Sequence, residues 1–292
     1  LIKEFNVVAV VTEIDKPAGR NNDIQTPPTK KIALQHNIIC LQPLKVKQNQ
    51  KFYESIKQLN PDLIVVVAYG KILPAEILNL PEHGCINIHP SLLPKYRGPS
   101  PIQTAILNGE KTIGVSLILM DDKMDSGDII SQESIEVGDD EGYKSLSERL
   151  ATLSAEILQK IIPKYIDSVC DLEVQNDGEA SYCHLLQKDN GHINWQKPAT
   201  RVYNQIRAYE FWPGSFTVFN NKKLDIIKAN PVDIKIDDNS KIGKVSNYEG
   251  MIIVRCGNGY LELLEVKLEG KKAMQIKDFI NGQTQFVGSV LS

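Results

Sequence analysis

The sequence predicts an α/β protein in which a mostly parallel sheet domain is followed by a small β-rich domain. Over residues 5–162, short apolar runs typical of strands alternate with segments of helical periodicity. The run 62–68 is apolar after its first residue, as in a strand that is covered on both faces of a parallel sheet. Beyond residue 209, short apolar segments are separated by Asn, Gly and Asp, which is typical of an antiparallel sheet or barrel.

Each element is predicted from its own pattern. Strands of the first domain are expected at residues 5–12, 38–41, 63–68, 85–89, 114–119 and 129–131. Helices are expected at residues 26–36, 51–59, 75–79, 100–107 and 145–162. Prolines open the first helix, and the last carries its apolar residues on one side. After a helix at residues 199–209, strands are expected at residues 215–219, 224–229, 243–245, 251–255 and 260–266.

The composition excludes several classes of protein. The 292 residues are 42% hydrophobic and 24% charged, which is ordinary for a folded soluble chain. No apolar stretch approaches the roughly 20 residues that cross a bilayer, and no secretory signal is visible. We therefore expect a cytosolic protein. The compartment is expected to be a bacterial cytoplasm or an organellar matrix, and the protein a monomer. Five cysteines are scattered without a Cys-x-x-Cys pair, so we predict neither a disulfide framework nor a metal site.

The charge is unevenly distributed along the chain. Residues 188–292 contain 15 Lys and Arg against 11 Asp and Glu, a net of +4, whereas residues 1–187 contain 18 against 25, a net of -7. A solvated, lysine-rich surface explains such an excess in most proteins. It also suits contact with a polyanion, because lysines attract phosphates.

Asn87 and His89 are the first candidates for chemistry. Polar and apolar residues alternate over 86–89, so both side chains, and Cys85 with them, should leave the strand on one face. Such a pair at a strand end often only satisfies backbone groups. Here the pair closes a strand of an expected parallel sheet, where ligands bind, and a Pro- and Gly-rich turn follows at residues 90–101.

Two motifs carry a resemblance to a known family. Ser91-Leu92-Leu93-Pro94-Lys95-Tyr96-Arg97-Gly98 and Asp125-Ser126-Gly127-Asp128 are similar to the signature of the folate-dependent formyltransferases, nearest to the branch that acts on methionyl-tRNA. Further segments resemble that branch in the same order over nearly the whole chain: Lys16-Pro17-Ala18-Gly19-Arg20, Val66-Val67-Ala68-Tyr69-Gly70, Phe211-Trp212-Pro213 and Gly270-Lys271-Lys272-Ala273-Met274. The resemblance implies a Rossmann-like first domain and an OB-like barrel as the second.

The resemblance also implies a reaction. A formyl group would pass from 10-formyltetrahydrofolate to the free amino group of methionine on initiator Met-tRNA. Asn87 is expected to donate a hydrogen bond to the formyl oxygen, and His89 to act as general acid. Asp125 would orient His89, favour its charged form and take up the amine proton. Spacing alone does not choose among the carboxylates of this loop, but the family pattern aligns the catalytic one with Asp125 and leaves structural roles for Asp121, Asp122 and Asp128.

Binding residues follow from the same resemblance. The folate is expected on Ser91, Leu92, Leu93 and Pro94. The loop that holds Arg20 would enter the acceptor end of the tRNA, and Lys271 and Lys272 would contact the tRNA from the second domain. Phe211 and Trp212 could stack on bases, although a packed corner between domains is the expected role.

The expected domains are a catalytic domain at residues 1–164, a linker at 165–191 and a tRNA-binding domain at 192–292. Compared with the family, the chain begins almost directly at the second strand, so we interpret it as a fragment that lacks about one strand and one helix. The missing strand would lie in the middle of the sheet, and its absence would expose backbone groups and apolar side chains.

Other functions are weighed against this one. A formyltransferase acting on a nucleotide-linked amino sugar would use the same trio, and a folate-dependent hydrolase would replace the amine by water. Glycinamide ribonucleotide formyltransferase resembles the first domain alone. A non-catalytic RNA-binding protein would not need the trio. A dinucleotide-binding oxidoreductase is disfavoured because no Gly-x-Gly-x-x-Gly follows a predicted strand.

Overall fold

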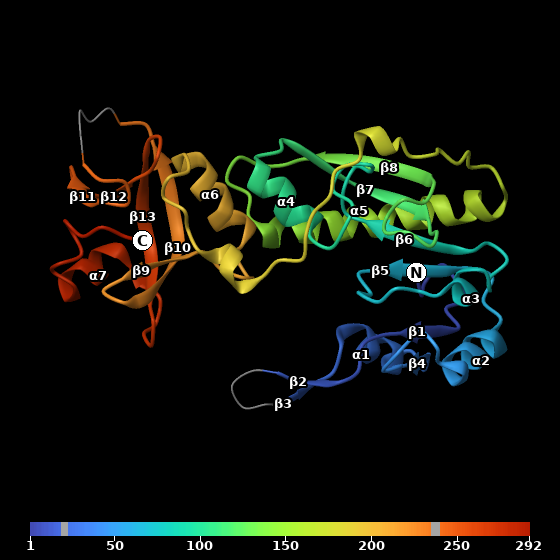
Figure 1. The fold of residues 1–292 in the computed structure, drawn as a ribbon. Coiled ribbons are helices and arrows are strands. Elements are labelled where there is room, and N and C mark those ends of the chain that lie inside the picture. The colour runs from blue at the N-terminus through green and yellow to red at the C-terminus, as the bar shows by residue number, and fades with distance from the viewer. Residues whose placement is uncertain (19–22, 235–239) are drawn as a thin grey trace. The chain divides into compact units, whose positions relative to one another are not determined.

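The computed structural model describes residues 1–18, 23–234 and 240–292, and these residues form two compact units (Figure 1). Unit 1 comprises Leu1–Pro99, Gly114–Ser134 and Leu150–Tyr182. Unit 2 comprises Ser100–Ile113, Ile135–Arg149 and Cys183–Ser292. The chain therefore enters unit 2 twice before its C-terminal part completes that unit.

Unit 1 is built on a four-stranded sheet in the order β5-β6-β7-β8, with residues Ile64–Val67, Cys85–His89, Thr112–Leu119 and Ile129–Glu136. The first pair is parallel, whereas β6 and β7 are antiparallel. Two further pairs of strands are separate: β1 (Ala9–Val11) with β4 (Ile39–Leu41) in parallel, and β2 (Lys16–Ala18) with β3 (Asp23–Gln25) antiparallel. The hairpin of β2 and β3 falls in a stretch predicted to be a loop, because its Pro, Gly and Asn residues lack strand periodicity.

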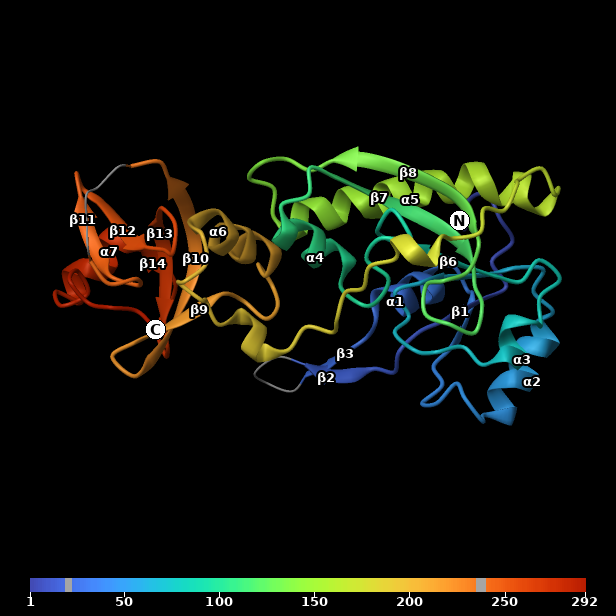
Figure 2. The same ribbon diagram turned by 45° about the horizontal axis from the view of Figure 1, so that its top comes forward.

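Helices cover these strands. They are α1 (Pro28–Gln35), α2 (Gln50–Leu59), α3 (Ala75–Leu78) and α5 (Tyr143–Ile166), the last beginning in unit 2 and continuing in unit 1. Helix α5 runs along β7 and β8 in both views (Figures 1 and 2). The Asn49 side chain caps α2 by accepting from the Phe52 N–H at 3.1 Å, which satisfies a donor that the helix leaves without a partner. Phe52 and Ile56 then pack into the core beneath the sheet.

The central position of β6 fixes the candidate residues. Because β5 and β7 pair with its two edges, its backbone is held on both sides. Ile86 and Ile88 are buried, and strand alternation places Asn87 and His89 on the opposite face. Cys85 does not line the site as expected: its thiol packs against the Ile77 and Leu78 carbonyls, and burial raises its pKa to about 12.

Unit 2 contains an antiparallel sheet in the order β11-β12-β13-β10-β9, with β14 added beside β13. Its strands are β9 (Phe216–Phe219), β10 (Lys222–Val232), β11 (Val245–Tyr248), β12 (Met251–Arg255), β13 (Tyr260–Leu268) and β14 (Met274–Gln275). Its helices are α4 (Pro101–Asn108), α6 (Ala199–Ala208) and α7 (Ile276–Gly282), with short 3-10 turns at Asp177–Glu179 in unit 1 and Lys188–Gly191. Helix α6 packs on β10, and α7 packs on β13 (Figure 2).

The core of unit 2 is aromatic at one end and aliphatic along the sheet. The rings of Phe219, Phe279 and Phe286 meet edge to face, with centroids 5.0 to 6.2 Å apart. The sequence did not predict α7, since its seven residues are too few for a clear helical period. The predicted fold class, an α/β domain with a mostly parallel, Rossmann-like sheet followed by a small β-rich domain, is confirmed, and the sheet of the second domain is antiparallel and curled. Among the described helices, none has both the length and the apolar character needed to cross a bilayer.

Candidate active site

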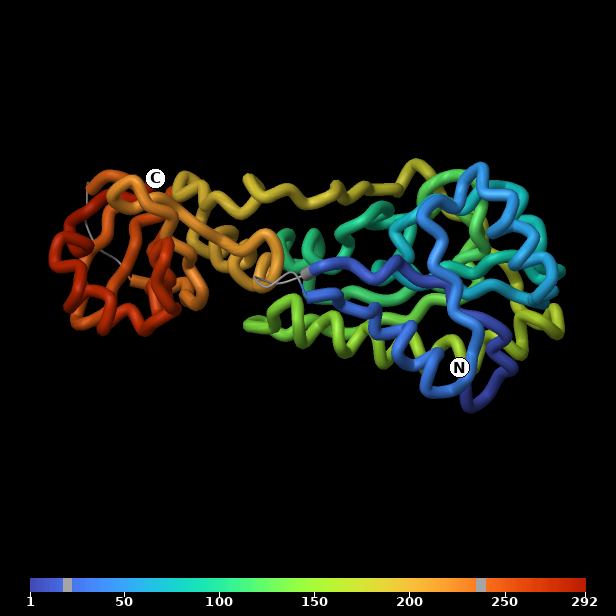
Figure 3. The backbone as a smooth tube through the Cα atoms, turned by 90° about the horizontal axis from the view of Figure 1, so that it is seen from below, coloured from blue at the N-terminus to red at the C-terminus, as the bar shows by residue number. Residues whose placement is uncertain are grey.

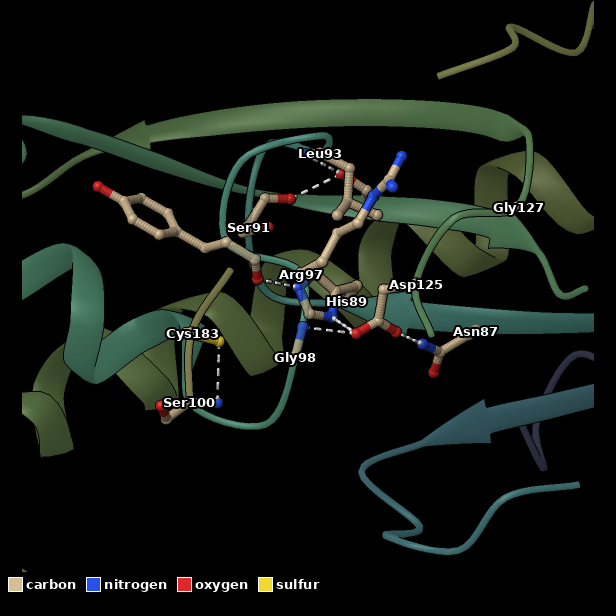
Figure 4. Close-up of polar contacts among 12 residues, drawn as sticks. Asn87, His89, Ser91, Leu93, Arg97, Gly98, Ser100, Asp125, Gly127 and Cys183 are labelled. Carbon is tan, nitrogen blue, oxygen red and sulfur yellow. Dashed lines mark hydrogen bonds and ion pairs between the residues drawn. The ribbon is translucent and has the colours of Figure 1, made fainter. Parts of the chain in front are cut away.

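The structure brings Asn87, His89 and Asp125 together (Figure 4). The carboxylate of Asp125 lies between the other two side chains. Its Oδ1 accepts a hydrogen bond from Asn87 Nδ2 at 3.3 Å, and its Oδ2 lies 3.6 Å from His89 Nδ1. The Gly98 N–H also donates to Oδ2, at 2.8 Å. One carboxylate thus orients an amide and an imidazole that lie two residues apart on β6.

The loop after β7 presents Asp125 to the strand. Asp125 has a φ of +52°, a left-handed conformation that aspartate tolerates better than most residues. The Leu119 N–H donates to the Asp128 carbonyl at 2.9 Å and closes the base of this loop. Gly127 lies so close to β7 that a Cβ there would be 1.8 Å from the Leu119 carbonyl oxygen. The loop therefore requires glycine where it folds back on the strand.

The hydrogen bonds of His89 assign its tautomer. Its Nε2 lies 2.9 Å from the Tyr96 carbonyl oxygen, which can only accept, so Nε2 carries a hydrogen. In neutral His89 the lone pair of Nδ1 then faces Asp125, and protonation adds an N–H directed at that carboxylate. The two side chains are only 5% and 15% exposed. A proton gained or lost by His89 therefore moves at Nδ1, beside Asp125.

Burial lowers the pKa of His89, while the charge of Asp125 and the hydrogen bond to the Tyr96 carbonyl act in the opposite direction. Burial has the larger effect, so the pKa of His89 lies below its ordinary value. As expected, Asp125 favours the charged form of His89, but burial outweighs this contribution.

Histidine titration by NMR tests whether burial outweighs the charge of Asp125 in setting the pKa of His89. We expect the imidazole of His89 to titrate below the ordinary histidine range, and the Asp125→Asn variant to shift its pKa lower still, because the carboxylate that favours the charged form is gone. Among the five histidine signals, that of His89 is the one that disappears in a His89→Gln variant. A pKa of His89 above the ordinary range would contradict the dominance of burial.

The other carboxylates of the loop do not reach the trio. Asp121 accepts from the Ser126 hydroxyl at 2.9 Å and from the Lys123 N–H at 3.0 Å, so it braces the loop from within. Asp122 is exposed. Asp128 contributes its backbone carbonyl to the loop closure. Asp125 is the carboxylate of this loop that contacts both Asn87 and His89.

The predicted folate-binding residues divide into two kinds. Ser91 and Leu93 are buried, with 0% and 3% of their surface exposed. The Ser91 hydroxyl donates to the Lys95 carbonyl at 2.6 Å, and the Leu93 N–H donates to the Ser116 hydroxyl at 3.1 Å. Leu92 and Pro94 are half-buried and keep exposed apolar surface. Ser91 and Leu93 therefore shape the turn, whereas Leu92 and Pro94 keep part of their apolar surface exposed.

The predicted tRNA-binding residues lie in different surroundings. Arg20 is outside the described residues. Lys271 and Lys272 are exposed in the turn that follows β13. Phe211 and Trp212 are 63% and 56% exposed, and the Phe211 ring meets the Tyr143 ring edge to face with centroids 6.2 Å apart. Their packing in a corner between domains stays a prediction.

Three residues at the site were missed by sequence reasoning. Gly98 and Tyr96 serve through backbone atoms, one donating to Asp125 and the other accepting from His89. Both lie within the motif 91–98, so the motif was the feature of the sequence that could have identified them. Gln175, whose amide donates to the Asp125 carbonyl at 3.0 Å, lies in a polar stretch without periodicity, and no pattern in the sequence distinguishes it. Among the described residues, no group of three or more His, Cys, Asp or Glu side chains is placed to hold a metal.

Comparison with known proteins gives the family. Residues 3–162 match the formyl transferase model, and residues 185–284 match the formyl transferase C-terminal domain. The chain belongs to the formyl transferase family. A methionyl-tRNA formyltransferase of Caldanaerobacter subterraneus subsp. tengcongensis is 43% identical over 287 residues, which cover 98% of this chain and 92% of the relative.

Other members agree in length and fold. A methionyl-tRNA formyltransferase of Caldicellulosiruptor saccharolyticus is 39% identical over 290 residues, with 99% of this chain and 93% of the relative covered. The crystal structure of WlaRD, a sugar 3N-formyl transferase studied with dTDP and 5-N-formyl-THF, has a TM-score of 0.62 at 23% identity, covering 90% of this chain and 88% of that one. At that identity the likeness shows the fold alone.

Proposed function

We propose that this chain, acting as a monomer in the cytoplasm, transfers the formyl group of 10-formyltetrahydrofolate to the amino group of methionine on initiator Met-tRNA. One observation carries the proposal: the Asp125 carboxylate is held between the Asn87 amide and the His89 imidazole. This constellation suits acyl transfer to an amine, and the chain belongs to the formyl transferase family. Relatives named methionyl-tRNA formyltransferase, 37–43% identical, cover nearly all of it.

The amine attacks the formyl carbon, and negative charge develops on the formyl oxygen. One N–H of the Asn87 amide is directed at Asp125, which leaves the second for that oxygen. Charge stabilisation of this kind is effective because the donor is already oriented before the reaction. No nucleophile from the protein is needed, since the nitrogen of methionine forms the new bond to carbon as the bond from carbon to N10 breaks.

The same reaction moves one proton from the attacking amine to N10. Asp125 and His89 share a contact at Nδ1, so together they can take the proton from the amine and return one to the leaving nitrogen. The low pKa of buried His89 favours the neutral, accepting form first. Because Gly98 and Asn87 both donate to Asp125, the carboxylate keeps its place while the proton moves.

The formyl donor would be held beside the trio. Leu92 and Pro94 offer the exposed apolar surface that suits a pterin ring, and buried Ser91 and Leu93 hold the turn that carries them. The folate itself would supply the formyl group, on its N10, and this chain would supply its orientation.

The tRNA would be bound by cations and aromatic rings. Lys271 and Lys272 are exposed on unit 2 and suit the phosphate backbone. The exposed rings of Phe211 and Trp212 suit stacking on bases. Arg20 would contact the acceptor end from unit 1. Together these residues favour a nucleic acid as acceptor over a nucleotide-linked sugar.

Single-turnover transfer from 10-formyltetrahydrofolate tests the proposal. With methionine-charged initiator tRNA as acceptor, we expect formyl-methionine to appear, and we expect the His89→Ala variant to lose nearly all transfer while it keeps its affinity for tRNA. A dTDP-linked amino sugar serves as the competing acceptor. Formylation of the sugar in place of the tRNA would reject the tRNA substrate, and equal turnover by the His89→Ala variant would reject the catalytic trio.

A further inference from the structure

The chain that follows α5 turns back along unit 1, and Figure 3 shows it as an extended yellow trace. Within this stretch, residues 173–182 contact both backbone segments that complete the trio. Glu173 exchanges two hydrogen bonds of 2.8 and 2.9 Å with Ile129, at the end of the Asp125 loop. Ser181 accepts from the Tyr96 N–H through its hydroxyl and from the Arg97 N–H through its carbonyl, each at 2.9 Å.

Gln175 is the centre of these contacts. Its Nε2 donates to the Asp125 carbonyl at 3.0 Å and to the Gly127 carbonyl at 2.7 Å. Its Oε1 accepts from Arg97 Nε at 3.0 Å and from Nη2 at 2.8 Å. Both donors and both acceptor positions of the amide are used, and the side chain is 7% exposed. The opposite amide orientation would set oxygen against two carbonyls, so the contacts fix which way Gln175 points.

Arg97 fixes Gln175 in turn. The guanidinium is buried, with 2% of the residue exposed, and its Nη1 pairs with Asp177 at 2.8 Å. A guanidinium has only donors, so Gln175 must present oxygen to Arg97 and nitrogen to the loop. The result is a chain of polar contacts from Asp177 through Arg97 and Gln175 to the backbone of Asp125.

The loop needs such support. Asp125 and Tyr96 both have positive φ values, +52° and +62°, which cost free energy and persist only where neighbouring contacts impose them. Tyr96 presents its carbonyl to His89, and Asp125 presents its carboxylate to both partners. Residues 173–182 contact the backbone at each of these two positions.

We propose that Gln175 is a positioning residue for formyl transfer: by holding the carbonyls of Asp125 and Gly127, it keeps the Asp125 carboxylate between Asn87 and His89. Gln175 does not touch the reacting atoms and acts through Asp125. The inference rests on the proposed function for its activity readout, but the placement of the carboxylate can be measured without turnover.

Two substitutions separate the two ends of the amide. Gln175→Met keeps the length of the side chain and removes every hydrogen bond. Gln175→Glu keeps an acceptor for Arg97 but sets oxygen against the two carbonyls of the loop. For both variants we expect kcat to fall by about 10²-fold, the loss that an ångström of misplacement can cause, with KM for folate and tRNA nearly unchanged. Asn176→Ala is the matched control, because the Asn176 amide donates to the Glu179 carboxylate and accepts from the Gly178 N–H, both within residues 176–179.

Two further measurements separate the role of Gln175 from a loss of folded protein and from the identity of the substrate. Thermal unfolding reports how much of each variant is folded. Titration of His89 by NMR reports the carboxylate without turnover: Gln175→Met, which adds no charge, should lower the pKa of His89 relative to the parent, while Asn176→Ala should not. If the parent chain formylates no Met-tRNA, the proposed function fails while the titration still decides the role of Gln175. Parental kcat and parental His89 titration in Gln175→Met would overturn the inference, as would a loss of kcat that only follows the unfolded fraction.

Discussion

Replacement of Asp125 by asparagine is expected to lower the single-turnover rate of formyl transfer by about 10²- to 10⁴-fold, the range of general acid–base catalysis. The carboxylate accepts from Asn87 and Gly98 and faces Nδ1 of His89. An asparagine has one oxygen, so its amide N–H must meet a donor on one of these sides. The change also removes the negative charge that offsets the burial of a protonated imidazole. The proton relay is then lost, and either Asn87 or Gly98 loses its acceptor.

Asp122→Asn is the control for this prediction. It makes the same chemical change in the same loop. However, Asp122 is exposed, and the hydrogen bonds and the ion pair that join Asn87, His89 and Asp125 do not involve it. We expect it to keep the parental rate. The assay compares both variants with the parent at saturating folate and Met-tRNA, and circular dichroism verifies that they are folded. Equal losses in the two variants would mean that the charge of the loop, and not the position of Asp125, matters.

Periodicity and motifs in the sequence predicted the strands and the residues of the candidate site. Strand alternation at 86–89 placed Asn87 and His89 on one face, and the structure has them there. The apolar run 63–68 predicted a strand covered on both faces of a parallel sheet. The strand is present as β5 and pairs in parallel with β6, but it lies at the edge of the four-stranded sheet and is only half-buried. Asp125 could be chosen from its neighbours only by resemblance, because four carboxylates share the loop and the choice depends on the turn at Gly127.

What the sequence did not predict depends on contacts between distant segments. Gln175 meets Asp125 across 50 positions of sequence, and nothing local in residues 165–191 distinguishes it from a solvated linker residue. The burial of Ser91 follows from its place in the turn next to Ser116 on β7, whose hydroxyl donates to the Ser91 carbonyl. Local pattern cannot separate a polar residue that binds a ligand from one that satisfies the backbone of its own fold.

Replacement of Gly127 by alanine is expected to reduce the transfer rate by about 10²-fold, with a smaller loss of stability of about 1–3 kcal/mol. The added Cβ would lie 1.8 Å from the Leu119 carbonyl, so backbone must move. Leu119 ends the central strand β7, whose residues 113–118 are all buried, whereas the loop at 121–124 is exposed. We therefore expect the added Cβ to displace the loop and not the strand, and Asp125 to move with the loop.

Gly282→Ala is the matched control, because no atom lies within 4 Å of its Cβ position and it ends α7 in unit 2. There the substitution should leave transfer unchanged and alter stability by less than about 1 kcal/mol, since alanine mainly reduces the freedom of the unfolded chain. Measuring kcat and the free energy of unfolding for both variants shows whether the added Cβ displaces the loop or the strand β7. If Gly127→Ala loses stability but keeps the parental rate, the strand has yielded instead, and the position of Asp125 does not depend on the close approach of Gly127 to β7.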